Sequence, residues 1–309
     1  MIKKIDLITL LQLNDVGSKT ILKIYDYIEN RRLIDLDFND YIELLKEKFG
    51  RDYTKKDQEV AMLKAEKILE NCYLKDIHIF SFLDEDYPEK FQKINYDKPV
   101  IFYSKGNHRI MTDKYNLAII GSRRIDKKNY RIGYKFSKEI ASLGINIISG
   151  LALGSDTAGH KGSLSIKNSN NTGKTLAVLP SGIENIYPYE NKALSREIIE
   201  NSGCLISEKS PYEMPEKYDY IMRDRLQSAL SEGIFIIQSR LNSGTQHTVN
   251  YGIKYSKKIY CLGINIENKG MELNRKLIEE NKAFRINSEE EFIKVILKER
   301  DEHNEISHQ

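Results

Sequence analysis

The residues best suited to chemistry in this chain are a run of cations that directly follows an apolar segment. The stretch GSRRIDKKNYR, from Gly121 to Arg131, holds five basic side chains and one acid, Asp126. Guanidinium groups can bind a phosphate through two parallel hydrogen bonds. Arg123, at the end of a predicted strand and the start of a predicted helix, is therefore the first candidate for a phosphate contact. The alternative is a solvated helix start, which such charge runs commonly form.

Turns of small residues recur where other apolar segments end. They are Gly121-Ser122, Ser149-Gly150, Ser181-Gly182, Ser207-Glu208 and, a few residues beyond the fifth segment, Ser243-Gly244-Thr245. In an open α/β sheet ligands bind at the carboxyl ends of the strands, where helix N-termini present free N–H groups to anions. Any βα connection needs such a turn, so one alone says little. Several at one edge favour a phosphate-bearing ligand.

Two other sets of residues could do chemistry, and we interpret both as structural. Asp156 and His160 share one helix face at a spacing that could serve acid and base catalysis. The simpler interpretation is that Asp156 caps the helix and His160 packs beside it. The three cysteines, Cys72, Cys204 and Cys261, have no metal-site spacing and no even pairing. We therefore predict no enzyme, no catalytic residue, no metal and no cofactor.

The elements that would position these residues alternate between short apolar runs and helical patterns. The runs are residues 117–120, 145–148, 176–179, 204–206, 234–237 and 259–262. Continuous apolar runs are typical of strands buried on both faces, and parallel strands need crossover helices between them. The pattern predicts an α/β, Rossmann-like, doubly wound, mostly parallel sheet.

The first part of the chain has a different, helical pattern. LLQLNDVGSKTILKIYDYIE predicts a short helix, a Val-Gly turn and a second helix that begins at Ser18 or Thr20. This unit is similar to a helix-hairpin-helix or SAM-like domain, and a plain αα-hairpin is an equal alternative. We expect four parts: a small helical domain at 1–75, an extended bridge at 76–110, the Rossmann-like domain at 111–300 and a polar tail at 301–309.

Composition indicates a globular protein of the cytoplasm. Hydrophobic residues make up 40% and charged residues 30%, and the net charge is +3. So small a charge does not by itself indicate nucleic acid. No run approaches the roughly 20 apolar residues that a membrane-spanning helix needs, and the start turns polar too soon for a secretory signal.

Four linked motifs carry a resemblance that covers residues 77 to 278. They are AIIGSRR, IISGLALGSDTAGHKGSL, GKTLAVLPSGIENIYPYEN and GCLISE, preceded by DEDYPEKFQKINYDKPVIFYSKG. In this order and spacing they resemble the DNA-processing protein DprA/Smf family of the SLOG superfamily. The resemblance implies a Rossmann-like protein that binds and protects single-stranded DNA and forms a homodimer. It also implies a role in loading the recombinase RecA during DNA recombination and natural transformation.

The resemblance also extends the candidate phosphate-binding set. The added cations are Lys161, Lys174, Arg223 and Arg225. Two positions depart from the family pattern. Asp224 replaces the usual Asn between two arginines and would repel phosphate or pair with a neighbouring Arg, and Gln238 stands in place of an acid.

Two other functions remain alternatives. The same strand-end glycines could hold a single nucleotide, as in a SLOG-type nucleotide sensor or hydrolase. The PGGxGTxxE motif of the nucleotide-cleaving branch is absent from the sequence, which disfavours cleavage. The chain could also be an interaction module in which residues 1–110 recruit partners.

Overall fold

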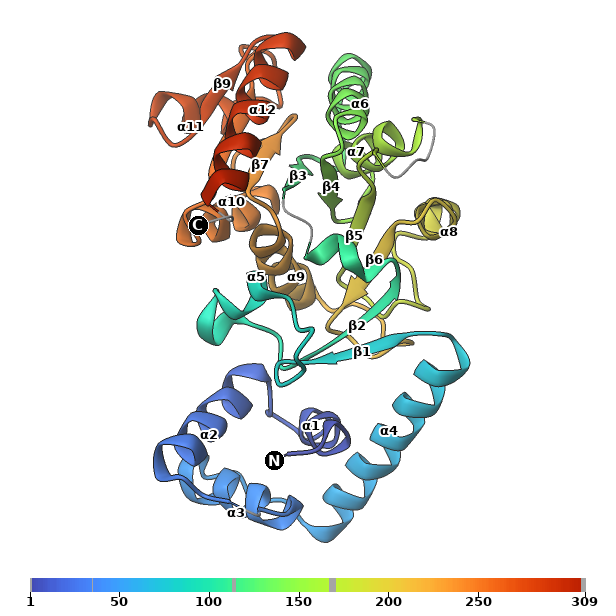
Figure 1. Cartoon of the computed structure of the whole chain (residues 1–309), viewed down its shortest axis with the longest axis vertical. Coiled ribbons are helices and arrows are strands. Elements are labelled where there is room, and N and C mark those ends of the chain that lie inside the picture. The colour runs from blue at the N-terminus through green and yellow to red at the C-terminus, as the bar shows by residue number, and fades with distance from the viewer. Residues whose placement is uncertain (1, 35, 113–114, 167–170, 307–309) are drawn as a thin grey trace. The chain divides into compact units, whose positions relative to one another are not determined.

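The chain forms two compact units in the computed structural model, which describes residues 2–34, 36–112, 115–166 and 171–306 (Figure 1). The first unit comprises Met1–Tyr87 and Phe91–Tyr103, and the second comprises Pro88–Lys90 and Ser104–Gln309. The candidate residues of the sequence all belong to the second unit.

Helices dominate the first unit. They are α1 (Lys4–Leu11), α2 (Ser18–Arg31), α3 (Phe38–Phe49) and α4 (Lys55–Leu74). Helix α2 begins at Ser18, as predicted, and Asp37 and Thr54 cap α3 and α4 with side-chain oxygens. The chain then forms β1 (His78–Ser81), the short helix α5 (Glu89–Gln92) and β2 (Ile101–Gly106). The predicted bridge thus contains regular elements.

A parallel sheet forms the centre of the second unit. Its strands lie side by side in the order β6 (Cys204–Ser207), β5 (Thr175–Leu179), β4 (Asn146–Ser149), β3 (Asn116–Ile120), β7 (Gly233–Ile236), β8 (Lys258–Leu262) and β9 (Phe284–Ile286). Each neighbouring pair in this series is parallel. This confirms the α/β, Rossmann-like class. Strand β9 was not predicted because its first two residues are exposed, so it has no continuous apolar run.

Crossover helices connect the strands of this sheet. They are α6 (Lys127–Ser142), α7 (Ser155–Leu164), α8 (Lys192–Glu200), α9 (Lys217–Leu230) and α10 (Thr245–Lys254), followed by α11 (Glu272–Glu279) and α12 (Glu289–Ile306). Aromatic rings join sheet and helices, with Phe235 centred 5.6 Å from Phe136 and 4.5 Å from Phe292. Helix α12 extends to Ile306 and so includes residues that we expected in a polar tail.

The strand order reverses at β3. Strands β4, β5 and β6 follow on one side of it, and β7, β8 and β9 follow on the other. The loops that leave β3 and β7 therefore diverge, which opens a crevice at the carboxyl ends of the strands, the usual ligand site of such sheets.

The three cysteines are buried, and none of them forms a disulfide. Cys204 and Cys261 lie in apolar strands, where a thiol packs as a small apolar side chain, and Cys72 is buried in α4. Burial raises the pKa of the Cys72 and Cys204 thiols to about 12. Across the described ranges, no helix has both the length and the apolar character to span a membrane.

Candidate nucleic-acid interface

The loop after β3 is fixed on both sides by backbone contacts. Gly121 has φ 151°, and a Cβ there would lie 2.4 Å from Ser155 Oγ and 2.7 Å from the Gln238 carbonyl oxygen. The Ser122 amide donates to that Gln238 oxygen at 2.7 Å, and the Ser122 carbonyl accepts from the Ser155 amide at 3.1 Å. The loop is thereby held between the ends of β7 and the start of α7, and Arg123 projects from it.

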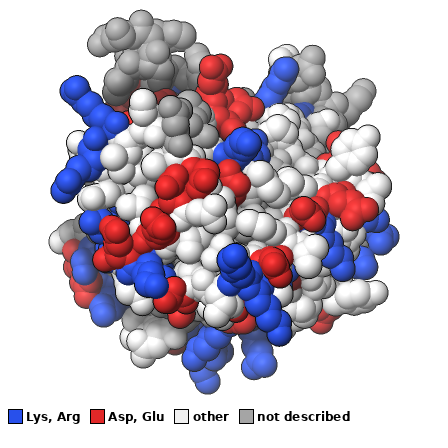
Figure 2. Space-filling view, turned by 90° about the horizontal axis from the view of Figure 1, so that it is seen from below, with Lys and Arg blue, Asp and Glu red and all other residues white. Residues whose placement is uncertain are grey.

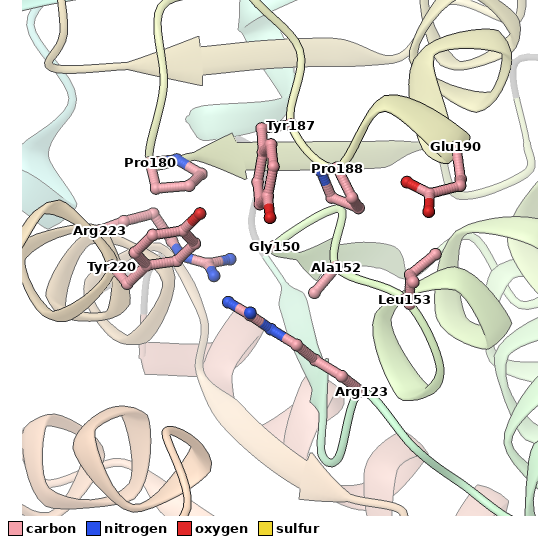
Figure 3. A pocket seen from close by; sticks show the side chains of 10 residues that line it. All are labelled: Arg123, Gly150, Ala152, Leu153, Pro180, Tyr187, Pro188, Glu190, Tyr220 and Arg223. Carbon is pink, nitrogen blue, oxygen red and sulfur yellow. The ribbon is translucent and has the colours of Figure 1, made fainter. Parts of the chain in front are cut away.

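The Arg123 guanidinium reaches over an aromatic ring instead of pairing with an acid. Its Cζ lies 5.0 Å from the ring centroid of Tyr220 on α9. The Tyr220 ring in turn meets Tyr187 edge-on, with centroids 6.4 Å apart. Figure 3 shows Arg123 pointing into the pocket beside these rings. Within the described part of the chain, no carboxylate forms an ion pair with Arg123, so its charge is available to a ligand.

A second guanidinium, that of Arg223, is buried in the same pocket. Arg223 is only 8% exposed, and its Nη1 donates to the Val178 carbonyl at 3.3 Å. Two acids flank it: Asp224 Oδ1 lies 3.2 Å from Nε, and Asp156 Oδ2 lies 4.0 Å from Nη1. Asp224 therefore pairs with a neighbouring arginine, as one of the two expectations for this position has it.

Burial dominates the electrostatics of these acids. Removal from water raises the pKa of Asp224 to about 7, against the lowering effect of Arg223. Burial also raises the pKa of Asp156, again opposed by Arg223 and by two backbone hydrogen bonds. Arg223 thus forms ion pairs with two carboxylates, whereas Arg123 acts on Asp224 only as a weaker, more distant charge.

A cavity of about 370 Å³ lies between these groups and the start of α10. Its walls are Ile120, Gly121, Ser122, Arg123, Ala152, Asp156, Tyr220, Arg223, Asp224, Gln227, Ser243, Gly244, Thr245 and Thr248. Gly244 is the N-cap of α10, and a Cβ there would meet no atom within 4 Å. The N-terminus of α10 and two guanidinium groups therefore face one cavity, an arrangement suited to an anion.

An adjoining cavity of about 120 Å³ adds apolar and aromatic walls. Pro180, Tyr187 and Pro188 come from the loop after β5, and Arg123 and Arg223 line both cavities (Figure 3). Aromatic rings beside guanidinium groups can stack against the unpaired nucleobases of a single strand. Tyr220 was missed in the sequence, although its place three residues before Arg223 on one helix puts both side chains on the same face.

Most of the predicted phosphate-binding residues meet at this edge. Those that line the cavities are Gly121, Ser122, Arg123, Gly150, Arg223, Ser243, Gly244 and Thr245. Ser149 lies beneath them, and its hydroxyl donates to the Ile119 carbonyl at 2.6 Å.

The remaining predicted residues lie elsewhere. Lys174 precedes β5 and so stands at the amino end of the strands, opposite the cavity, and Lys161 is exposed near the last turn of α7. Arg225 is 1% exposed and holds Glu208, with Nη2 2.6 Å from Oε1. Arg225 is two residues from Arg223 on α9, so its side chain leaves the helix on a different face from that of Arg223.

Ser181 and Gly182 pack against the loop that follows β6. The Ser181 carbonyl accepts from the Ser207 hydroxyl at 2.7 Å, and a Cβ on Gly182 would lie 2.1 Å from the Ser210 carbonyl oxygen. Neither residue lines the two cavities. Their role in this arrangement is to let two loops approach closely.

Asp156 and His160 both make hydrogen bonds that hold the fold around the site. The predicted capping role of Asp156 is wrong in detail, because Gly154 is the N-cap of α7. Asp156 Oδ2 instead accepts from the backbone amides of Gly150 and Ala152, at 3.1 and 3.2 Å. His160 is a buried packing residue, as interpreted, with Nδ1 2.7 Å from Thr175 Oγ1.

Known proteins resemble this chain in both sequence and structure. The model of the DNA recombination-mediator protein A family matches residues 78–297. Protein Smf of Borreliella burgdorferi is 31% identical over 250 residues, which is 80% of this chain and 76% of that protein. The DNA processing protein DprA of Streptococcus pneumoniae is 32% identical over 183 residues, 59% of this chain and 62% of its own length.

Two solved structures resemble the fold. The X-ray structure of DprA from Streptococcus pneumoniae matches with a TM-score of 0.77 and 24% identity, covering 94% of this chain and 97% of that one. A Helicobacter pylori DprA structure, described in terms of its single-stranded DNA binding mode, matches with a TM-score of 0.64 and 27% identity. That match covers 72% of this chain and 96% of the other.

Proposed function

Because the chain belongs to the DNA recombination-mediator protein A family, we propose that it binds single-stranded DNA at the carboxyl edge of its sheet. Arg123 would hold one phosphate of the strand, and the N-terminus of α10 would hold a neighbouring phosphate. The observation that carries this proposal is the open guanidinium of Arg123 over the cavity, with no acid paired to it within the described residues. Single strands bind to such combinations of cations and aromatic rings.

The cations that support the proposed binding are the two arginines that line the cavity, Arg123 and Arg223. Figure 2 shows one face of the molecule on which acidic and basic side chains are interspersed. Net charge is only +3. Affinity should therefore depend on few phosphate contacts at the cavity, and not on a broad basic surface.

The wider role that we propose is that of a binding protein and not of an enzyme. His160 and Asp156 each hydrogen-bond to another part of the fold, His160 to Thr175 and Asp156 to the Gly150 amide. The protein would protect single-stranded DNA and help to load the RecA recombinase on it, in recombination or DNA uptake. A homodimer is part of this proposal, and sedimentation of the purified protein would test it.

A titration with two ligands tests the site. A fluorescent oligothymidylate and a labelled mononucleotide are each titrated with protein at 50 and 200 mM salt. We expect the oligonucleotide to bind more tightly and to lose affinity at least about tenfold between the two salts, because each phosphate contact releases counterions. Tighter binding of the mononucleotide would overturn the proposal in favour of a nucleotide sensor, for which a cavity of about 370 Å³ has room.

A further inference from the structure

Arg223 lies between two buried carboxylates at the floor of the cavity. Asp224 belongs to the same helix and Asp156 to α7, and their side chains are 10% and 8% exposed. The three groups together carry one net negative charge when both acids are ionised. A phosphate that enters this floor meets these two like charges beside the Arg223 guanidinium, while the Arg123 guanidinium lines the same cavity.

The acids are too buried for water to screen that repulsion. Interactions between charges in partly buried sites are several times stronger than in bulk water. Loss of one negative charge would leave Arg223 and a single carboxylate as a neutral pair. The cheapest way to lose it is to take up a proton on either acid, because neither backbone nor side chain has to move.

We propose that the binding of a phosphodiester at this site takes up one proton, held by the Asp156 and Asp224 pair, so that affinity for single-stranded DNA falls as the pH rises. This inference rests on the proposed function and deepens it, since it assigns a form of regulation to the same site. The pair titrates as one unit, so the proton belongs to both acids.

The other groups that face the pair do not supply this proton. Arg123, from the loop after β3, stays charged. Tyr220 on α9 has a pKa raised above its ordinary value, mainly by burial, and stays neutral. His160 on α7 has its pKa lowered to about 3, chiefly by burial, and is also neutral. On α10, Thr248 lines the same cavity and has no ionisable group.

The direction of the pH effect on affinity follows because DNA binding and proton binding are linked. The free pair has a pKa near 7 on Asp224, and a bound phosphate raises it further. Affinity is therefore constant while the pair is already protonated and weakens above about pH 7, by up to tenfold per pH unit. Protonation of an ordinary histidine, with a pKa of about 6.5, would change affinity mainly at lower pH.

Oligothymidylate affinity measured by fluorescence anisotropy from pH 6 to 9, at fixed salt, tests the proposal. For the unmodified protein we expect at least fivefold weaker binding at pH 8.5 than at pH 6.5. The affinity of Asp224→Asn should be independent of pH over this range. At pH 8.5 it should equal the affinity of the unmodified protein at pH 6.5. Glu197→Gln, which removes an exposed charge on α8, and His247→Gln should both keep the pH dependence.

A second measurement counts the proton directly. Calorimetric titration at pH 8 in two buffers of different ionisation enthalpy should show uptake of close to one proton per site, and close to none for Asp224→Asn. If Asp224→Asn and Asp156→Asn both kept the pH dependence of the unmodified protein, the inference would be overturned, but the proposed DNA site would remain. No binding to oligothymidylate at any pH would overturn the proposed function itself.

Discussion

The Arg223 guanidinium fills the space that a side chain at position 150 would occupy, so only Gly150 fits there. A Cβ on Gly150 would lie 1.3 Å from Arg223 Nη1 and 2.4 Å from Cζ, and 2.8 Å from Asp156 Oδ2. The guanidinium is therefore seated directly on the backbone of the turn after β4. The same turn is tied to Asp156 through the Gly150 amide, so turn, acid and arginine form one unit.

Replacement of Gly150 should unseat the arginine. In Gly150→Ala we expect the Arg223 side chain to move and oligonucleotide affinity to fall at least fivefold, because a methyl group cannot share that volume. Anisotropy measures the affinity, and circular dichroism shows whether the sheet is intact. Gly17→Ala is the matched control, since a Cβ there meets nothing within 4 Å. Equal affinity in both variants would show that the position of Arg223 does not matter for binding.

Arg225 should matter for stability and not for the site. It is buried and donates to both carboxylate oxygens of Glu208. Truncation in Arg225→Ala leaves Glu208 without its partner, and we expect the free energy of unfolding to fall by about 3 kcal/mol. Urea unfolding measures this loss. The folded fraction of the variant should still bind oligothymidylate, and a large loss of affinity in folded protein would place Arg225 back in the site.

The sequence predicted the strands and most of the turns because their signals are local. Continuous apolar runs and Gly or Ser at strand ends were sufficient to find β3 to β8 and to gather Arg123, Gly150 and Gly244 at one edge. Side-chain direction and strand polarity are not local. Lys174 was grouped with the site although it precedes its strand, and Arg225 was grouped with Arg223 although the helix turns it to Glu208.

His160 should be neutral and locked in one tautomer. The Thr175 hydroxyl donates its hydrogen to the Ile147 carbonyl, so His160 Nδ1 must donate to the Thr175 oxygen. Burial lowers the pKa of His160 to about 3. Nitrogen NMR of the ring should show the Nδ1–H form unchanged from pH 8 to 5. A ring that titrates near pH 6.5 would contradict this environment.

His160 also predicts a direction for stability. The unfolded chain binds a proton at this histidine below about pH 6.5, whereas the folded chain does so only near pH 3. Unfolding therefore takes up a proton between these values. The contribution of His160 to stability is complete above about pH 6.5 and is lost as the pH falls toward 3. Urea unfolding of His160→Gln should show a weaker dependence on pH in this window than the unmodified protein.

Two lysines provide a test of where the DNA does not bind. Lys174 stands at the amino end of the strands and Lys161 near the last turn of α7. We expect the double variant Lys161→Glu and Lys174→Glu to lose less than threefold in oligonucleotide affinity, because neither side chain lines the cavity. A tenfold loss would extend the DNA path across α7 to the opposite edge of the sheet.

The most direct test compares two adjacent arginines. Arg123 lines the cavity, whereas its neighbour Arg124 is exposed and does not. Both variants, Arg123→Glu and Arg124→Glu, change the net charge equally, so oligothymidylate anisotropy at one salt concentration separates position from charge. We expect at least a tenfold loss of affinity for Arg123→Glu and less than a threefold loss for Arg124→Glu. Equal losses, or none for Arg123→Glu, would contradict a phosphate site at this edge of the sheet.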